Sequence, residues 1–203
     1  MDRARGPSVR AGRRPTTTRA QISHVGLGLF TRQGFDQTGV EELAAAAGIS
    51  RRTLFRYFPS KSDVPWGDFD AELLRMRSFL AALPPSTPLA EGLRLALLDF
   101  NTFPPEEAPW HRQRMALLFG VPALQAHSTL MYAGWRRVVA EHVAERTGAQ
   151  PDDHRPRTIA WLLLGVALAS YEQWLADDDA DLLELLSDGG RLIGAGLAGP
   201  HAA

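Results

Sequence analysis

The sequence predicts an all-α protein of about nine helices, built as a small N-terminal head joined to a larger helical bundle. Two observations predict this class. Apolar residues recur at intervals of three, four and seven through most of the chain, which is the spacing of one helix face. No stretch alternates apolar and polar residues for long enough to predict a strand. The breaks between helices are predicted where proline, glycine or aspartate cluster, at residues 84–85, 104–105, 120–122, 148–151 and 177–179.

Composition narrows the class of protein. With 203 residues and 45% hydrophobic content, the chain can bury a sizeable core. The sequence has no cysteine, so it has no disulfide framework, thiolate metal site or cysteine nucleophile, and a reducing, cytoplasmic location is expected. The longest uncharged apolar run, residues 158–171, is shorter than a bilayer span, and no membrane partner is expected.

The formal net charge of −1 hides a strong asymmetry along the chain. Residues 1–61 contain eleven Lys and Arg against four acidic residues, which gives a net charge of +7. The remaining chain contains 11 basic and 19 acidic residues, which gives −8. Such a separation indicates a polyanionic partner for the first third of the chain only.

Three segments are predicted from these patterns. Residues 1–17 carry five Arg and a single large apolar side chain, and are predicted to be a disordered basic arm. Residues 18–62 are predicted to form the head, and residues 63–203 the helical bundle. All five Trp lie in the bundle segment, which therefore holds the larger core.

The head is predicted to hold three short helices. The first begins at Thr18 and ends at Gly34, a favourable C-terminal stop. Thr38 is predicted to cap the second helix, and Gly48 closes it. Ser50 is predicted to cap the third.

The third helix is short and two-sided, since it cannot extend past Pro59. Its apolar face carries Leu54 and Phe58. The opposite face carries Arg51, Arg52, Phe55 and Arg56. Two short helices joined by a tight glycine-containing turn describe a helix-turn-helix, whose second helix enters the major groove of DNA.

The residue types on the third helix suit contacts with duplex DNA. Arginine can bond the O6 and N7 atoms of guanine, while hydroxyl groups and the ammonium of Lys61, at the start of a fourth helix, can bond phosphates. A merely solvated basic face is the alternative interpretation. The predicted DNA-binding residues are Thr38, Ser50, Arg51, Arg52, Thr53, Phe55, Arg56, Tyr57 and Lys61.

The order of these features resembles a known family. The stretch "LFTRQGFDQTGVEELAAAAGISRRTLFRYFPSKSDV" is similar to the DNA-binding domain of TetR-type transcriptional regulators, because the glycine, cap and aromatic positions agree together. It departs at Arg52, where a small residue is common, and at Pro65 with Trp66, which interrupt the opening of the fourth helix. The resemblance extends to the subgroup associated with mycofactocin biosynthesis gene clusters through "PSKSDVPWGDFD", "FNTFPPEEAPWHRQRM", "VPALQAHSTLMYAGW" and "YEQWLADDDADL".

The resemblance implies a regulator, most simply a repressor, that binds a palindromic operator as a homodimer. The segment "IAWLLLGVALA", residues 159–169, is apolar on nearly every side, and a last helix carries leucines up to Leu197. Such helices need burial on all sides, either in the core or in a subunit interface. TetR-type proteins dimerise through their last two long helices, which favours the interface.

The bundle is also predicted to bind a ligand. Aromatic and methionine side chains in a helical interior can accept irregular apolar molecules, although each of them alone is equally compatible with ordinary core packing. The resemblance implies an acyl-CoA or a metabolite of the mycofactocin pathway as effector. The candidate wall residues are Trp66, Phe69, Phe103, Trp110, Met115, Phe119, Met131, Tyr132, Trp135 and Trp161.

No metal site, cofactor or enzymatic activity is predicted. The six histidines lack the spacing of metal-ligand motifs, and "GGRLIGAG" is not a dinucleotide-binding fingerprint. No catalytic dyad is recognisable. The alternative function is a small-molecule binding or carrier protein that keeps a vestigial helix-turn-helix head as a scaffold.

Overall fold

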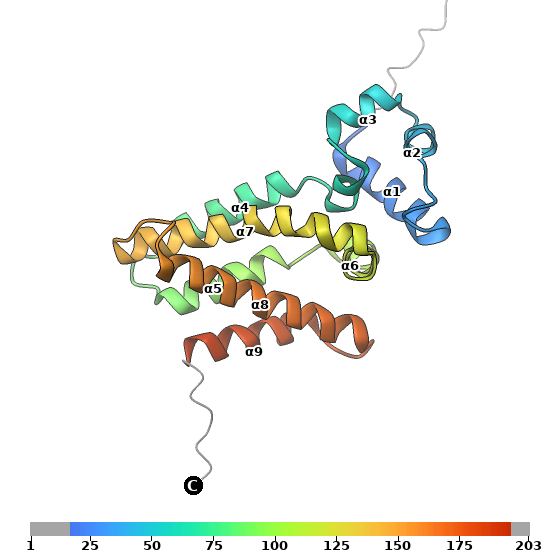
Figure 1. Cartoon of the computed structure of the whole chain (residues 1–203). Helices are drawn as coiled ribbons and strands as arrows, with labels where there is room; N and C mark the ends of the chain where they lie inside the picture. Colours follow the sequence, from blue (N-terminus) through green and yellow to red (C-terminus); the bar gives the residue numbers. More distant parts are fainter. Residues whose placement is uncertain (1–16, 196–203) are drawn as a thin grey trace, which may run out of the picture.

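The computed structural model describes residues 17–195, within which the chain forms nine α-helices and two short 3-10 helices and no strand (Figure 1). This confirms the predicted all-α class. The predicted basic arm, apart from Thr17, and Leu197 lie outside the described residues. In chain order the elements are α1 Arg19–Gln33, α2 Val40–Ala46, α3 Arg51–Tyr57, η1 Lys61–Trp66, α4 Phe69–Ala82, α5 Leu89–Phe100, η2 Pro105–Glu107, α6 Ala108–Gly120, α7 Pro122–Thr147, α8 His154–Ala176 and α9 Leu182–Gly194.

Helices α1, α2 and α3 form the head around a small apolar core. Thr18 caps α1 through a capping box with Gln21, and Gly34, with φ 91°, ends the helix as predicted. At the start of α3 the Ser50 hydroxyl accepts the backbone N–H of Thr53 at 3.1 Å, which confirms the predicted cap. The buried core side chains include Ile22, Phe30, Leu43, Leu54 and Phe58.

The predicted cap of α2 is wrong. Gly39 occupies the N-cap position, and no side chain caps the helix. Thr38 is only 1% exposed, and its hydroxyl donates to the carbonyl oxygen of Gly34 at 2.8 Å. The hydroxyl thus bonds back to the end of α1 rather than forward to α2, a competition that is typical of threonine near helix ends. A side chain buried in this way is not presented to DNA.

The single fourth helix that the sequence predicts from Lys61 is also wrong. The chain forms the 3-10 helix η1, breaks at Gly67 with φ 64°, and begins α4 only at Phe69. Pro65 contributes to the break because it has no backbone N–H to donate. The predicted boundary after residue 62 falls inside η1, which packs against α1 as well as against α6 and α7. The element η1 therefore joins the head to the bundle.

The bundle is built around α7 and α8, which pack along each other. Helices α4, α5 and α6 pack against α7, and α9 packs against both α5 and α8. Figure 1 shows α9 on the side of the bundle away from the head. By length and composition α8 is the one helix in the described part of the chain that could cross a bilayer. In the bundle, one side of this helix packs against α6, α7 and α9.

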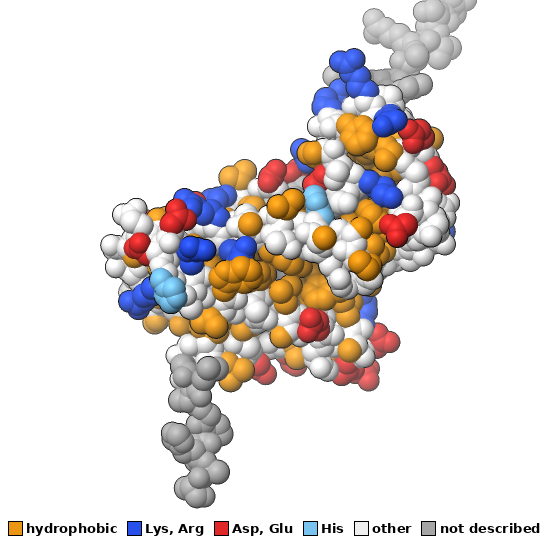
Figure 2. All heavy atoms as spheres, viewed as in Figure 1, with side chains coloured by type: hydrophobic (Ala, Val, Ile, Leu, Met, Phe, Trp, Pro, Cys, Tyr) orange, Lys and Arg blue, Asp and Glu red, His pale blue; other side chains and the backbone are white. Residues whose placement is uncertain are grey.

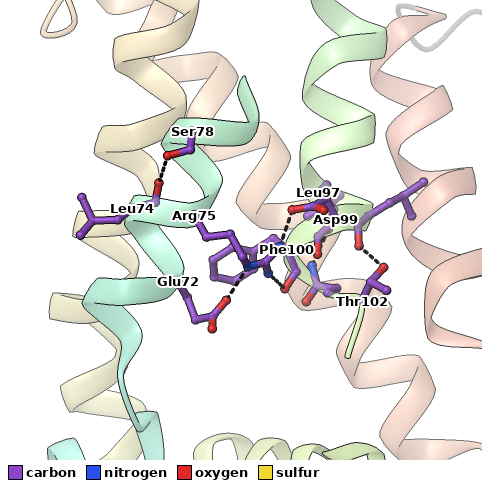
Figure 3. Close-up of polar contacts among 10 residues, drawn as sticks. Glu72, Leu74, Arg75, Ser78, Leu97, Asp99, Phe100 and Thr102 are labelled. Carbon is purple, nitrogen blue, oxygen red and sulfur yellow. Dashed lines mark hydrogen bonds and ion pairs between the residues drawn. The ribbon is translucent and has the colours of Figure 1, made fainter. Parts of the chain in front are cut away.

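Arg75 of α4 forms hydrogen bonds with the C-terminal end of α5 (Figure 3). The guanidinium of Arg75 bonds the carboxylate of Glu72 at 2.9 Å, the side chain of Asp99, and the carbonyl oxygens of Asp99 and Phe100. A cation suits this place because the C-terminal carbonyls of a helix carry partial negative charge. The contact holds Glu72 and Phe100 in place, and both residues line the cavity described below.

Candidate nucleic-acid interface and ligand cavity

The outward face of α3 is basic and solvent-exposed. Leu54 and Phe58 are buried, as the sequence predicts. Figure 2 shows Lys and Arg side chains gathered at the α3 end of the head. We call the four exposed side chains of this helix the basic face of α3: Arg51, Arg52, Phe55 and Arg56.

The arginines of this face differ in their partners. Arg51 forms an ion pair with Glu41 of α2 at 2.7 Å. Within residues 17–195, Arg52 and Arg56 form no ion pair, although the Arg56 guanidinium lies 5.5 Å from the ring centre of Tyr57. These two charges are therefore available to a polyanion without breaking an existing salt bridge.

Two side chains that the sequence predicts to contact DNA, Lys61 and Tyr57, form hydrogen bonds within the protein. The ammonium of Lys61 donates to the carbonyl oxygens of Phe35 and Thr38, at 2.8 and 3.1 Å, and lies 4.2 Å from the ring centre of Phe35. The hydroxyl of Tyr57 donates to the carbonyl oxygen of Thr17 at 2.8 Å. Lys61 therefore holds the loop between α1 and α2, and only its remaining N–H could bond a phosphate.

A largely apolar cavity of about 100 Å³ lies inside the bundle. Six of the ten predicted wall residues line it, namely Trp66, Phe69, Phe103, Met115, Tyr132 and Trp135. The other lining residues, none of them among the ten predicted wall residues, are Glu72, Leu97, Phe100, Asn101, His111, Arg114, Leu118, Leu164, Ala167, Leu168 and Tyr171.

The remaining four predicted wall residues do not line this cavity. Trp110 stacks on His24 of the head, with ring centres 4.8 Å apart. Phe119 packs near Tyr171, and Met131 is half-buried on α7. Trp161 is 55% exposed on the outside of α8, beneath the guanidinium of Arg136 at 3.4 Å. Helical periodicity alone does not distinguish these outer positions from the wall.

A buried hydrogen-bonded chain forms part of the polar wall, beside Glu72 and Arg114. Nε2 of His111 lies 2.8 Å from the hydroxyl of Tyr171. That hydroxyl donates to Oδ1 of Asn101, whose Nδ2 donates to the carbonyl oxygen of Leu97 at 2.7 Å. Tyr171 lies 60 residues from His111 and 70 residues from Asn101 in the sequence, so no local motif predicts these contacts.

Burial controls the protonation of these groups. It lowers the pKa of His111 to about 3, with a smaller contribution from the nearby charge of Arg114. Burial also raises the pKa of Tyr171 above its usual range. At neutral pH the wall therefore holds a neutral imidazole and a neutral phenol.

Polar contacts connect the bundle to η1 and to the head. Arg114 of α6 donates from Nε to the carbonyl oxygen of Pro65 in η1 at 2.7 Å. Two histidine–carboxylate contacts accompany it, His127 with Asp63 at 2.9 Å and His24 with Glu107 at 3.0 Å. Arg114 and Trp66 also line the cavity, so the wall of the cavity and the head–bundle junction share residues.

The comparisons with known proteins match both parts of the chain. Residues 22–64 match the family model described as bacterial regulatory proteins, tetR family, and residues 87–198 match the MftR C-terminal domain. The chain belongs to the TetR family. Its members are transcriptional regulators and not enzymes, which confirms the predicted class of function.

Two relatives of this TetR-family protein are similar along most of its length. One is named as a candidate mycofactocin biosynthesis transcriptional regulator, MftR, of Mycobacterium tuberculosis. It is 47% identical over 188 residues, which cover 93% of this chain and 95% of the relative. The other is the HTH-type transcriptional regulator TcmR of Streptomyces glaucescens, 30% identical over 187 residues, which cover 87% and 81%.

Solved structures share the TetR fold at low sequence identity. The fatty acid degradation regulator FadR of Bacillus halodurans has a TM-score of 0.62 and 18% identity, covering 92% of this chain and 99% of its own. FadR of Thermus thermophilus, solved in complex with lauroyl-CoA, has a TM-score of 0.59 and 23% identity, covering 91% and 97%. At this identity the likeness concerns the fold alone.

Proposed function

We propose that this TetR-family regulator is a homodimeric repressor of mycofactocin-type genes, released from a palindromic operator by a small apolar ligand. The observation that carries the proposal is the shared junction: Trp66 lines the cavity and is also the last residue of η1. An occupant that moves Trp66 acts directly on the element that joins the basic face of α3 to the bundle. The matches to MftR support the choice of target genes.

The dimer is supported by an exposed apolar strip on α8. Trp161 and Leu162 are 55% and 53% exposed, and Gly165 has open space around its Cα, so a second helix can approach closely. We expect a twofold axis across this strip to bring two copies of α3 to one side of the dimer. Half-sites of an operator would then lie about 34–36 Å apart, which is one turn of DNA.

The dimer proposal can be tested by sedimentation equilibrium at micromolar concentration. The parent protein is expected to be a dimer, and Leu162→Glu a monomer. Leu130→Glu is the matched control, because Leu130 is 68% exposed on α7 and outside the strip. A parent protein that sediments as a monomer would refute the dimer.

A long-chain acyl-CoA is the first effector to test, supported by the FadR structure with lauroyl-CoA. The cavity of about 100 Å³ is smaller than the roughly 300–1,000 Å³ of pockets for drug-sized ligands. A long acyl chain therefore enters only if the helices around the cavity move apart. A coupling of about 1–3 kcal/mol would lower operator affinity about 5- to 150-fold.

The deciding experiment is a titration of the purified protein onto its own upstream intergenic DNA, with and without acyl-CoAs. We expect tighter binding to this DNA than to a random fragment, and release by the effector. Equal affinity for both fragments would instead favour the carrier-protein alternative. A protein that acts on chromosomal DNA is proposed to be cytoplasmic.

A further inference from the structure

Two buried polar atoms on the cavity wall have no hydrogen-bond partner among the described residues. They are Nε1 of Trp66 and Nδ1 of His111. His111 is 6% exposed, so its free nitrogen is not satisfied by bulk solvent. Nearly all buried polar groups in proteins are bonded, and the exceptions often mark a place that a ligand or water completes. Both residues line one cavity, and an occupant of that cavity is the simplest source of the missing partners.

The hydrogen-bonded chain assigns the proton on His111. The Nδ2 of Asn101 donates to Leu97, so the amide turns its Oδ1 toward Tyr171. The single hydroxyl proton of Tyr171 is donated to that Oδ1. The Tyr171 oxygen can then only accept from Nε2 of His111, at 2.8 Å. Because burial keeps the ring neutral, Nδ1 carries a lone pair and acts as an acceptor.

Among the described residues, the side chains that line the cavity therefore hold a buried unpaired acceptor, Nδ1 of His111, and a buried unpaired donor, the indole N–H of Trp66, beside the charged side chains of Glu72 and Arg114. We propose that the effector carries a hydroxyl group on an apolar body, with the hydroxyl donating to His111 and accepting from Trp66. This inference rests on the proposed ligand-released function and specifies the chemical class of the ligand, favouring a small hydroxyl-bearing compound over the acyl-CoA named above as the first effector to test. A hydroxyl is the smallest organic group that offers both a donor and an acceptor.

Groups that only accept hydrogen bonds match the wall less well. An ether, aldehyde, ester or thioester can bond Trp66 but leaves Nδ1 of His111 without a donor. Water offers both bonds, and a ligand group that displaces water without reproducing its bonds loses affinity. Size favours a small ligand as well, because a 150 Å³ protein cavity holds benzene, and this one measures about 100 Å³.

The test compares isomers that differ only in the hydrogen-bond donor. Alcohols from 1-propanol to 1-hexanol are titrated into the full-length, ¹⁵N-labelled protein beside their isomeric methyl ethers, and the Trp66 indole resonance is assigned with Trp66→Phe. We expect saturable chemical-shift changes of this indole and of the His111 ring nitrogens. At least one alcohol should bind about tenfold tighter than its isomeric ether, which corresponds to one hydrogen bond of about 1.4 kcal/mol. Equal affinities, or no shift at Trp66 with any alcohol, overturn the proposal.

A matched pair of variants distinguishes the effect of the unpaired His111 nitrogen on ligand binding from the effect of changed side-chain packing. His111→Phe keeps an aromatic ring but removes the acceptor, and should abolish the preference for alcohols over ethers. His142→Phe is the control, because His142 is a buried histidine outside the cavity whose Nε2 is also unpaired. If His111→Phe does not fold, the isomer titration of the parent protein still decides.

Operator binding measured on the same samples distinguishes the two proposals. Alcohols that bind at Trp66 without releasing DNA would support the ligand class and count against the release function. Release of DNA by apolar compounds with no preference for a hydroxyl would overturn the ligand class and leave the release function intact.

Discussion

The basic face of α3 and the cavity of the bundle hold their polar groups in opposite ways. Arg52 and Arg56 stand in solvent without an ion pair in the described chain, so their partner is expected to come from outside. His111, Tyr171 and Asn101 are buried and bonded to one another. A solvated charged surface recognises a polyanion by charge and is weakened by salt, whereas a buried wall selects by shape and by its few unpaired atoms.

The largest effect is expected on the charged surface. Replacing Arg52→Ala together with Arg56→Ala should weaken operator binding about 100-fold, because each arginine contact with DNA is worth about 1–3 kcal/mol. Fluorescence anisotropy with labelled operator at several salt concentrations measures this loss. Arg77→Ala with Arg137→Ala removes the same charge from the bundle and serves as control. Equal affinity of the two double variants would show that α3 does not contact DNA.

Replacement of Lys61 tests whether this charge contributes to DNA binding or to the stability of the head. Because its ammonium bonds two carbonyl oxygens, Lys61→Met should lower the free energy of unfolding by about 2 kcal/mol, measured by urea denaturation. The salt dependence of DNA binding should stay unchanged. Arg56→Met, at an exposed position, should change stability by no more than about 0.5 kcal/mol. A reduced salt slope with unchanged stability would restore the phosphate contact that the sequence predicts.

Arg114 lines the cavity and bonds Pro65, and we propose that the two regions are coupled through it. Arg114→Met should reduce the ligand-induced loss of operator affinity by about 5- to 10-fold, within the range of typical allosteric coupling. Operator titrations with and without the ligand that releases the parent protein measure the coupling. Arg112→Met is the control, since Arg112 pairs with the exposed Asp178 of the bundle. Unchanged coupling in Arg114→Met would exclude this route.

The head was far more predictable than the cavity, for a physical reason. The stop at Gly34, the cap at Ser50 and the two faces of α3 depend on residues within four positions of each other, which sequence patterns report. The predicted cap at Thr38 is wrong because its hydroxyl can bond either to the end of α1 or to the start of α2. In the packed head it bonds the carbonyl oxygen of Gly34, at the end of α1. The bond of His111 to Tyr171 spans 60 residues, and nothing in either neighbourhood fixes it.

The smallest effect concerns the buried wall and its dependence on pH. His111 has a pKa of about 3 in the folded protein against about 6.5 when unfolded, so the unfolded chain binds the extra proton first. Stability from neutral His111 is therefore complete above pH 6.5 and is lost as the pH falls toward 3. Between pH 7.5 and 5.5 the parent should lose about 1 kcal/mol more than His111→Gln, which cannot titrate. Urea denaturation at both pH values measures the difference. His154→Gln, at an exposed position, should behave like the parent protein, and an identical pH dependence in all three would mean that the pKa of His111 is not lowered in the folded protein.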